Sequence, residues 1–327
     1  MNAPTSLSPA GTPFAGRRLC VVGNLNRDIK TAPLRPGEYL FHDGETSLDG
    51  VSETIGGGGA NSAAIAATLG AQATFIGQIG ADTLGDRLEA ALRRHGVACA
   101  LHRTPEQRTG TTVNLVFDTG ERHFLSCLPN NETLSFSALD LTALAGADHL
   151  LRADIWFSEA MLQDGNERLL RAARELGVTT SIDLNWDPHW GRASSEHVAR
   201  RKAAVRRVLP LVDLAHGNVR ELNEFTGETE LSASVQRLLE WGVRGVVAHL
   251  GARGAGWFSA GECHIEPAAP ISRRVMATGT GDVLSVCAML LSHCPEIPWV
   301  EKLRLANQVV AEFIEGRRTL IPTMEAP

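Results

Sequence analysis

The sequence predicts an α/β fold in which helices cover a mostly parallel sheet. From Arg17 onward, short runs rich in β-branched residues alternate with helical stretches, and this alternation is typical of βαβ units. The chain has 327 residues, of which 43% are hydrophobic. That composition favours one large core with a small appendage over two equal domains.

The predicted elements follow one another along the chain. The strands are Leu19–Val22, Ala73–Ile79, Ile155–Ser158, Thr179–Asp183, Leu211–His216 and Val246–Leu250. The helices are Ser62–Leu69, Asp82–His95, Glu167–Leu176, His197–Leu209 and Val283–Ser292. Asp82 can cap the second helix, and Gly96 ends it. The fourth carries five Arg and Lys residues, which predicts a solvated face.

Two polar stretches interrupt the alternation and predict a small strand-built lid over one edge of the sheet. The first covers residues 29–54, and the second covers residues 104–128 with a hairpin that turns at Asp118–Gly120. Both are insertions in one domain of residues 17–320. Residues 1–16 lack a basic start and an apolar core, so we expect a disordered tail there, with a second tail at residues 321–327.

The charge balance argues against a nucleic-acid partner, and the short apolar runs argue against a membrane span. The chain carries 31 Lys and Arg against 37 Asp and Glu, a net charge of −6, whereas polyanion binding requires Lys and Arg to neutralise phosphates. The longest apolar run, Val283–Leu291, has nine residues, and a spanning helix needs about 20. The six cysteines are scattered without a CxxC pair, which predicts mostly buried thiols in a reducing cytoplasm.

The strongest local motif is Ala277–Asp282 (ATGTGD), which leads directly into an apolar helix. Small residues at a helix start let backbone N–H groups converge on an anion, and the helix dipole favours negative charge there. A carboxylate beside that anion needs a task, such as accepting a proton from an attacking hydroxyl. The alternative is that Asp282 is an ordinary first-turn acid.

A run of four glycines, Gly56–Gly59, precedes Ala60–Asn61 and a helix of small residues. Glycine costs backbone entropy, so the run favours a place where something approaches the main chain closely. The spacing does not fit a dinucleotide fingerprint, and no Walker A motif occurs. A flexible turn is the alternative.

Polar residues also follow three predicted strands, as Gly23–Asp28, Asp183–Asn185 and Asn218–Glu221. Ligands of open parallel sheets bind at the carboxyl ends of the strands. Asn26 and Asp28 can hold vicinal hydroxyls, and the carboxylates and amides of the other two motifs suit a hydrated Mg²⁺. For the acid of the last motif, a helix-start role is the alternative.

Together these motifs resemble the PfkB, or ribokinase-like, family of carbohydrate and nucleoside kinases. One family signature resembles Gly56–Gly80, and the other resembles Val275–Leu284 (VMATGTGDVL), about 220 residues later. A D-x-N motif and an N-x-x-E motif lie between them, and the resemblance spans Arg17–Arg317. It implies a three-layer αβα sandwich with a mostly parallel sheet and a β-strand lid.

The resemblance also implies roles for individual residues in an ATP-dependent transfer of phosphate to a sugar or nucleoside hydroxyl. Asp282 would be the base, and the amides of Gly279, Thr280 and Gly281 would form the anion hole. The implied sugar-binding residues are Asn26, Asp28, Gly57, Asn61 and Glu159, the last at the end of the predicted strand Ile155–Ser158. The implied nucleotide-binding residues are Asn185, Asn218, Glu221, Leu250, Gly251, Gly254 and Asn307. Glu221 and Asn218 would organise Mg²⁺ through its waters, and the lid would supply a homodimer contact.

A few positions depart from the family pattern. Met276 and Ala277 replace Asp-Thr, and a thioether cannot replace a hard oxygen ligand, so activation by a monovalent cation is not expected. Asp187 stands where a basic residue is common, which is expected to reshape acceptor selectivity near the phosphates, including acceptance of phosphorylated sugars. Gly58 replaces a Lys usual in ribokinases, which argues against ribose itself. For His249, we favour packing over nucleotide contact.

Two functions are compatible with these observations. The first is an ATP-dependent sugar or nucleoside kinase. The alternative is a non-catalytic relative that binds sugar or nucleotide as a sensor, and the departures at Met276 and Asp187 favour it. Retention of Asp282 and its neighbouring glycines favours catalysis, because a sensor needs no base.

Overall fold

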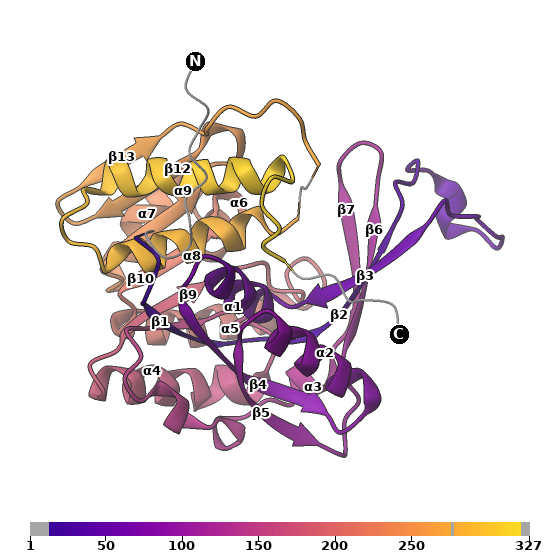
Figure 1. Cartoon of the computed structure of the whole chain (residues 1–327), viewed down its shortest axis with the longest axis horizontal. Coiled ribbons are helices and arrows are strands. Elements are labelled where there is room, and N and C mark those ends of the chain that lie inside the picture. Colours follow the sequence, from indigo (N-terminus) through magenta and orange to yellow (C-terminus); the bar gives the residue numbers. More distant parts are fainter. Residues whose placement is uncertain (1–12, 276–277, 322–327) are drawn as a thin grey trace.

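The computed structural model describes residues 13–275 and 278–321, which form a large main sheet and a smaller second sheet (Figure 1). The main sheet consists of β1 (Arg18–Val22), β4 (Gln72–Gly80), β5 (Ala98–Thr104), β8 (His149–Arg152), β9 (Thr179–Asp183), β10 (Leu214–Asn218), β11 (Gly245–His249), β12 (Ala255–Ser259) and β13 (Cys263–Glu266). Their order is β13-β12-β11-β10-β9-β8-β1-β4-β5. All neighbours pair in parallel except β11 with β12 and β12 with β13. The predicted α/β class with a mostly parallel sheet is confirmed.

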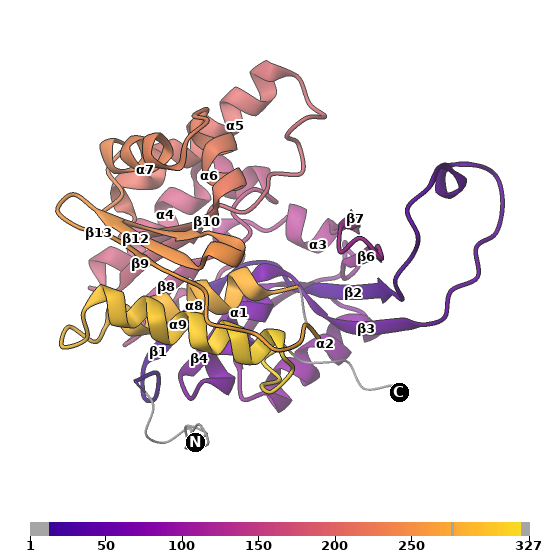
Figure 2. The ribbon, with the colours of Figure 1, turned by 90° about the horizontal axis from the view of Figure 1, so that it is seen from above.

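Helices cover both faces of this sheet and complete three layers (Figures 1 and 2). One face carries α1 (Gly58–Thr68), α2 (Thr83–Arg94), α8 (Thr280–Ser292) and α9 (Trp299–Ile314). The other carries α4 (Asn166–Glu175), α5 (Ser195–Val208), α6 (Val219–Thr226) and α7 (Leu231–Glu240). Side chains alternate along a strand, so Leu19 and Val21 of β1 enter the first core while Cys20 and Val22 enter the second.

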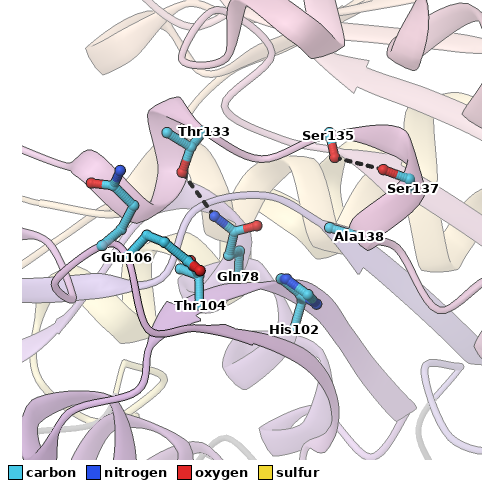
Figure 3. A pocket seen from close by; sticks show the side chains of 9 residues that line it. Gln78, His102, Thr104, Glu106, Thr133, Ser135, Ser137 and Ala138 are labelled. Carbon is cyan, nitrogen blue, oxygen red and sulfur yellow. Dashed lines mark hydrogen bonds between the residues drawn. The ribbon is translucent and has the colours of Figure 1, made fainter.

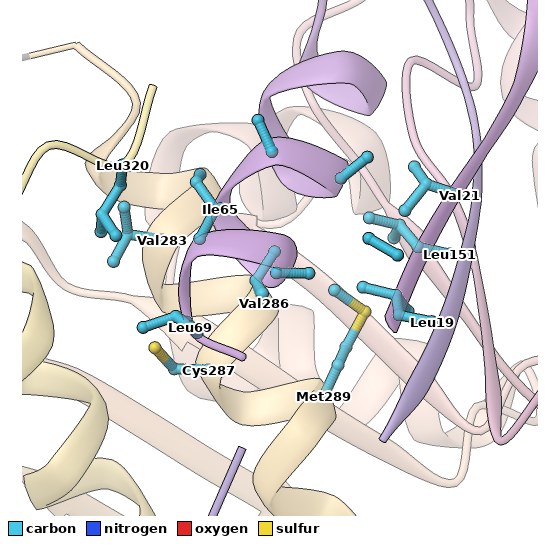
Figure 4. Close-up of a cluster of buried hydrophobic side chains, with 14 of the residues drawn as sticks. Leu19, Val21, Ile65, Leu69, Leu151, Val283, Val286, Cys287, Met289 and Leu320 are labelled. Atoms are coloured by element: carbon cyan, nitrogen blue, oxygen red, sulfur yellow. The ribbon is translucent and has the colours of Figure 1, made fainter. Parts of the chain in front are cut away.

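The longest apolar run of the sequence lies in α8 because that helix is enclosed on several sides. Every residue of Val283–Leu291 is buried, and α8 packs against both α1 and α9. Figure 4 shows Val286 and Met289 of α8 beside Ile65 of α1 and Leu19 of β1. A helix that is apolar all round suits such a position. Within the described part of the chain, no helix has the length and hydropathy to cross a membrane.

The predicted strand Ile155–Ser158 is wrong. The strand in this region is β8, which ends at Arg152, and the following residues form a turn. Ile155 and Trp156 are fully buried in the second core, so an apolar turn was mistaken for a strand. A smaller shift affects β10, which begins at Leu214 because the preceding Leu209–Leu211 forms a short helical turn.

The chain ends are more ordered than predicted where the structure describes them. Phe14 is buried in the first core, and the N–H of Gly16 donates to the carbonyl of Gly70 at 3.4 Å. Ile321, which was assigned to the second tail, is buried as well. The remaining tail residues, 1–12 and 322–327, and the departures Met276 and Ala277 lie outside the described residues. All six cysteines are free; Cys127 and Cys263 are exposed.

The second sheet is the lid. It consists of β2 (Asn26–Thr31), β3 (Val51–Gly56), β6 (Thr111–Val116) and β7 (Arg122–Cys127), in the order β3-β2-β6-β7. The β6–β7 hairpin turns at the predicted residues. Figure 2 shows β2 and β3 extending away from the main sheet, with the segment that joins them reaching farthest.

The strand registers give the lid two chemically different faces. The inner face, defined as the one that carries Asn26 and Asp28, is mostly polar, and its apolar members are Val116 and Phe124. The outer face carries apolar residues from all four strands. These are Ile29, Val51, Val113, Leu115 and Leu125. Val51 and Leu125 are 58% and 51% exposed.

Candidate active site

Five carboxyl groups converge where the lid meets the carboxyl ends of the central strands. They are Asp28, Asp154, Asp183, Glu221 and Asp282. Burial raises the pKa of each one, and the negative charges of other members of the group raise the pKa of Asp28, Asp183 and Asp282 further. We call these residues the acidic cluster. The sequence motifs that were far apart along the chain therefore meet in one place.

Asp282 lies in the first turn of α8 and faces the rest of the acidic cluster. Burial raises its pKa to about 8, and the charges of Asp154, Glu221 and Asp28 act in the same direction. A side-chain hydrogen bond with Asn61 opposes this rise. The residue is only partly buried, so a ligand can still reach it. A carboxyl group with such a pKa can exchange a proton near neutral pH.

The backbone that leads into α8 is open to an anion. Gly279 adopts a φ of 86°, and no side chain caps the helix. A Cβ at Gly279 would overlap Ile321, and one at Gly281 would lie 3.2 Å from Nδ1 of His249. The first N–H groups of a helix have no partner within the helix. Glycine at these two positions therefore allows a backbone conformation in which the N–H groups can bind an anionic ligand.

The glycine run at the start of α1 binds the side chain of Asp154. Its Oδ2 accepts from the N–H groups of Gly59 and Asn24, both at 2.8 Å, and its Oδ1 accepts from Gly58 at 3.2 Å. A Cβ at Gly57 would overlap the carbonyl of Asn24. The first N–H groups of α1 thus bind the carboxylate of Asp154, whereas those of α8 have no such side chain. The close approach to the main chain that the glycines predicted is therefore made by atoms of the protein itself.

Asp154 is the functional candidate that sequence reasoning missed. It has a left-handed φ of 52°, which costs a non-glycine residue about 1–2 kcal/mol. Its three hydrogen bonds to backbone N–H groups offset that cost. The available signal was an acid two residues after Arg152, the last residue of β8, but the strand predicted at Ile155–Ser158 pointed to Glu159 instead.

The predicted sugar-binding residues Asn26 and Asp28 lie side by side on β2. Nδ2 of Asn26 donates to Oδ1 of Asp28 at 2.8 Å and to Oγ1 of Thr112 at 3.3 Å. Burial raises the pKa of Asp28 to about 6, against the opposing charge of Lys30. Any Cβ at Gly56 would overlap Asp28. The polar pair therefore depends on a glycine in the neighbouring strand.

The structure does not bring Glu159 to the acidic cluster. Its side chain is 62% exposed and forms an ion pair with Arg201. One ligand atom each from Glu159, His189 and His197 lies within 4.8 Å of the others. The implied sugar contact by Glu159 is not supported, because the chain turns at Asp154 and carries residue 159 to the outside.

Asp187 does not present the free negative charge that was expected near the bound phosphates. It is 0% exposed, and its Oδ2 accepts from Nε of the buried Arg201 at 2.8 Å. Its Oδ1 accepts from the N–H of His189 at 2.9 Å. The negative charge of Asp187 is therefore neutralised by Arg201 inside the protein. Arg201 is buried, whereas we expected the basic residues of α5 to lie on a solvated face.

The D-x-N and N-x-x-E motifs supply oxygen atoms suited to a hard cation. Asn218 and Glu221 form a reciprocal capping box at the start of α6, in which Oε2 of Glu221 accepts from the N–H of Asn218 at 2.8 Å. Oδ1 of Asn185 is buried without a protein partner, and Asp183 is buried nearby in the acidic cluster. Carboxylate and amide oxygens of this kind fit Mg²⁺.

Three of the predicted nucleotide-binding residues, Leu250, Gly251 and Gly254, follow the end of β11, and Asn307 of α9 contacts the end of the neighbouring β13. Nδ2 of Asn307 donates to the carbonyls of Glu266 and Pro267 at 3.1 and 3.0 Å. Gly254 adopts a φ of 96°, and a Cβ there would overlap the carbonyl of Glu266. Asn307 and Gly254 thus hold the segment after β13 in place. Leu250 and Gly251 adjoin the same turn.

His249 packs under the start of α8. Its Nε2 shares a hydrogen bond of 3.1 Å with Oγ of Ser285, and burial lowers its pKa to about 4. The ring is therefore neutral at physiological pH. This position agrees with the packing role that we favoured.

A pocket of about 300 Å³ opens at the carboxyl ends of β4 and β5 (Figure 3). Its lining residues are Gln78, His102, Thr104, Glu106, Gln107, Thr133, Ser135, Ser137 and Ala138. Figure 3 shows Gln78 donating to Thr133, at 2.9 Å. No member of the acidic cluster lines this pocket, so it is separate from the candidate site.

Comparisons with known proteins identify similar sequences and folds. The family model for pfkB family carbohydrate kinases matches residues 17–324. A fructokinase from Vibrio alginolyticus is 26% identical over 216 residues, which are 66% of this chain and 68% of that protein. Ribokinase from Arabidopsis thaliana, solved with ribose and ATP, superposes with a TM-score of 0.73 at 23% identity over 93% of this chain and 94% of that one. An E. coli protein solved with ATP and Mg²⁺ superposes with a TM-score of 0.75 at 20% identity, over 91% and 93%.

Proposed function

The chain belongs to the PfkB family of carbohydrate kinases, and from this premise we propose that it transfers the γ-phosphate of ATP to a hydroxyl group of a sugar or nucleoside. The observation that carries the proposal is Asp282, a partly buried carboxyl group directly beside the uncapped amides of α8. A proton acceptor next to an anion-binding helix start is the arrangement that phosphoryl transfer to an alcohol requires.

Asp282 and the start of α8 divide the chemistry between them. Asp282 takes the hydroxyl proton as the hydroxyl oxygen bonds to the γ-phosphorus and the bond to the bridging oxygen of ADP breaks. The amides of Gly279, Thr280 and Gly281 stabilise the negative charge on the phosphoryl oxygens. This reaction needs little covalent help from the protein, so positioning and charge stabilisation dominate.

The remaining residues position the substrates. Asn26, Asp28 and Asn61 would hold the sugar, with Asp154 keeping the start of α1 in place. Asn185, Asn218 and Glu221 would hold Mg²⁺ through its waters, and the ion would neutralise phosphate charge. Relatives solved with ATP, one of them also with Mg²⁺, support these two cofactors. Leu250, Gly251, Gly254 and Asn307 are proposed to shape the nucleotide side of the site.

ADP release measured across a panel of pentoses, hexoses, sugar acids, sugar phosphates and nucleosides tests this proposal. We expect ADP release with ATP and Mg²⁺ that depends on at least one acceptor. The sensor alternative predicts no ADP release with any acceptor, although ligands would still raise the melting temperature. That pattern would overturn the kinase assignment.

The ionisation of Asp282 predicts how stability depends on pH. Its pKa is about 8 in the folded protein against an ordinary value of 3.8, so between these values the folded state holds a proton that the unfolded state has lost. This group therefore stabilises the fold fully below pH 3.8, and the contribution is lost as pH rises to about 8. In urea unfolding of ligand-free protein, the advantage of Asp282→Asn over wild type should grow by up to about 1.4 kcal/mol per unit between pH 5 and 8. A constant difference would show that Asp282 is already ionised in the folded state.

We also propose that two copies of the chain meet through the outer face of the lid. Val51 and Leu125 expose apolar surface there, beside partly buried Ile29 and Val113. Light scattering is expected to give twice the chain mass of 35.1 kDa, and Leu125→Asp is expected to give the single-chain mass. Ile265→Asp, at an exposed apolar residue of β13, is the control. A single-chain mass for wild type would refute this dimer.

A further inference from the structure

We propose that the acceptor carries an anionic group, a phosphate or a carboxylate, which binds Lys30 and Arg122 on the inner face of the lid. This inference rests on the proposed function and narrows its substrate class. It assigns a charge to the end of the acceptor that lies away from Asp282.

The strand registers place both cations on the inner face. Lys30 of β2 lies opposite Asn114 of β6, which in turn lies opposite Phe124 of β7. Arg122 is two residues from Phe124, so it points to the same face. Lys30 likewise shares its face with Asp28, two residues earlier on β2. The two cations therefore continue the row of groups proposed to hold the sugar.

These cations repel one another without an adequate protein counterion. Burial lowers the pKa of Lys30, and the charge of Arg122 lowers it further, with only Asp28 opposing. Burial and the charge of Arg274 likewise lower the pKa of Arg122. Among the described residues, neither Lys30 nor Arg122 forms an ion pair within 4.0 Å. An anion bound between them would relieve this repulsion.

Asn114 provides an independent sign of a missing ligand. Its side chain is 0% exposed, yet neither Nδ2 nor Oδ1 has a hydrogen-bond partner in the protein. Leaving buried polar atoms unpaired costs about 1–3 kcal/mol in general. In the pairing of β2 with β6, Asn114 lies directly beside Lys30. An anionic oxygen at this place can accept a hydrogen bond from Nδ2 of Asn114 as well as from the cations.

Asp28 links the candidate base to the two cations. It lies close enough to Asp282 and to Lys30 for its charge to act on both. A sugar held at Asn26 and Asp28 can therefore direct one hydroxyl to Asp282 while its opposite end reaches Lys30 and Arg122. Sugar phosphates and sugar acids have this form, whereas neutral sugars leave the cations unmatched.

Matched acceptor pairs test the inference in steady-state kinetics. Fructose 6-phosphate is compared with fructose for the phosphate case, and gluconate with glucose for the carboxylate case. In at least one pair, wild type is expected to show a kcat/KM at least about 100-fold higher for the anionic member, and Lys30→Met or Arg122→Met should lower that ratio at least about 10-fold. Lys30→Arg should retain most of it. Arg35→Met, at an exposed cation in the segment that joins β2 and β3, is the control and should leave the ratio as in wild type.

The outcomes separate this inference from the proposed function. Equal or better use of the neutral member in both pairs overturns the inference and leaves the kinase assignment in place. If no acceptor supports ADP release, melting temperatures without ATP decide. A rise with fructose 6-phosphate or gluconate that is absent in Lys30→Met and Arg122→Met supports the anion subsite. No rise in wild type with either anion overturns it.

Discussion

The Asp282→Asn variant is expected to lose turnover by about 10²–10⁴-fold while its affinities for ATP and sugar stay within about threefold. Asparagine keeps the shape of the side chain and can still pair with Asn61, but it cannot take a proton from the attacking hydroxyl. Initial rates of ADP release give the turnover, and calorimetric titration gives the affinities. The effect should therefore appear in kcat and not in binding.

Asp86→Asn is the matched control for this experiment. Asp86 is also a first-turn helix acid, in α2, but it is exposed and pairs with Arg103. If Asp282 were only a helix-start acid, both variants would change stability by about 1 kcal/mol or less and would leave turnover intact. Undiminished turnover in Asp282→Asn would overturn its assignment as the base.

The Arg201→Met variant is expected to lower the free energy of unfolding by about 3–5 kcal/mol. Arg201 is the ion-pair partner of Asp187, which is 0% exposed, and its removal leaves a buried charge without compensation. Urea unfolding monitored by tryptophan fluorescence measures the loss. The double variant Arg201→Met with Asp187→Leu should recover most of it, because it removes both charges together.

A surface ion pair supplies the comparison for Arg201. Arg237 pairs with Glu228 on the exposed side of α7, and Arg237→Met should cost about 1 kcal/mol or less. Equal losses in Arg201→Met and Arg237→Met would show that Asp187 is not dependent on its partner. A double variant less stable than Arg201→Met would contradict the charge-burial argument as well.

The sequence was sufficient to predict the layers of the fold, because burial on one or two faces leaves a periodic pattern. Helix α2 shows this directly, with Asp82 accepting from the N–H of Gly85 as its cap. The strand before Glu159 was misplaced for a physical reason. Ile155 and Trp156 are as apolar as strand residues, and their burial in a turn depends on the second core.

The candidate site likewise contains residues that could be predicted from the sequence and residues that could not. Asp282 and the residues of the N-x-x-E motif could be found, because each stands at the boundary of a regular element. Asp154 could not be found in this manner, because its role follows from a left-handed φ and from bonds to residues about 95 and 130 positions away. Pairing between Asp187 and Arg201 likewise depends on how α5 packs, which no local pattern encodes.

Two of the connections between the lid and the main body also hold residues of the candidate site. Strand β2 starts at Asn26, and β3 ends at Gly56, two residues before α1 begins. A tilt of these strands must therefore displace Asp28 and pull on the first turn of α1, where Asn61 contacts Asp282. Under the proposed function, this connection links acceptor binding mechanically to the position of Asp282, and such a link disfavours hydrolysis of ATP by water.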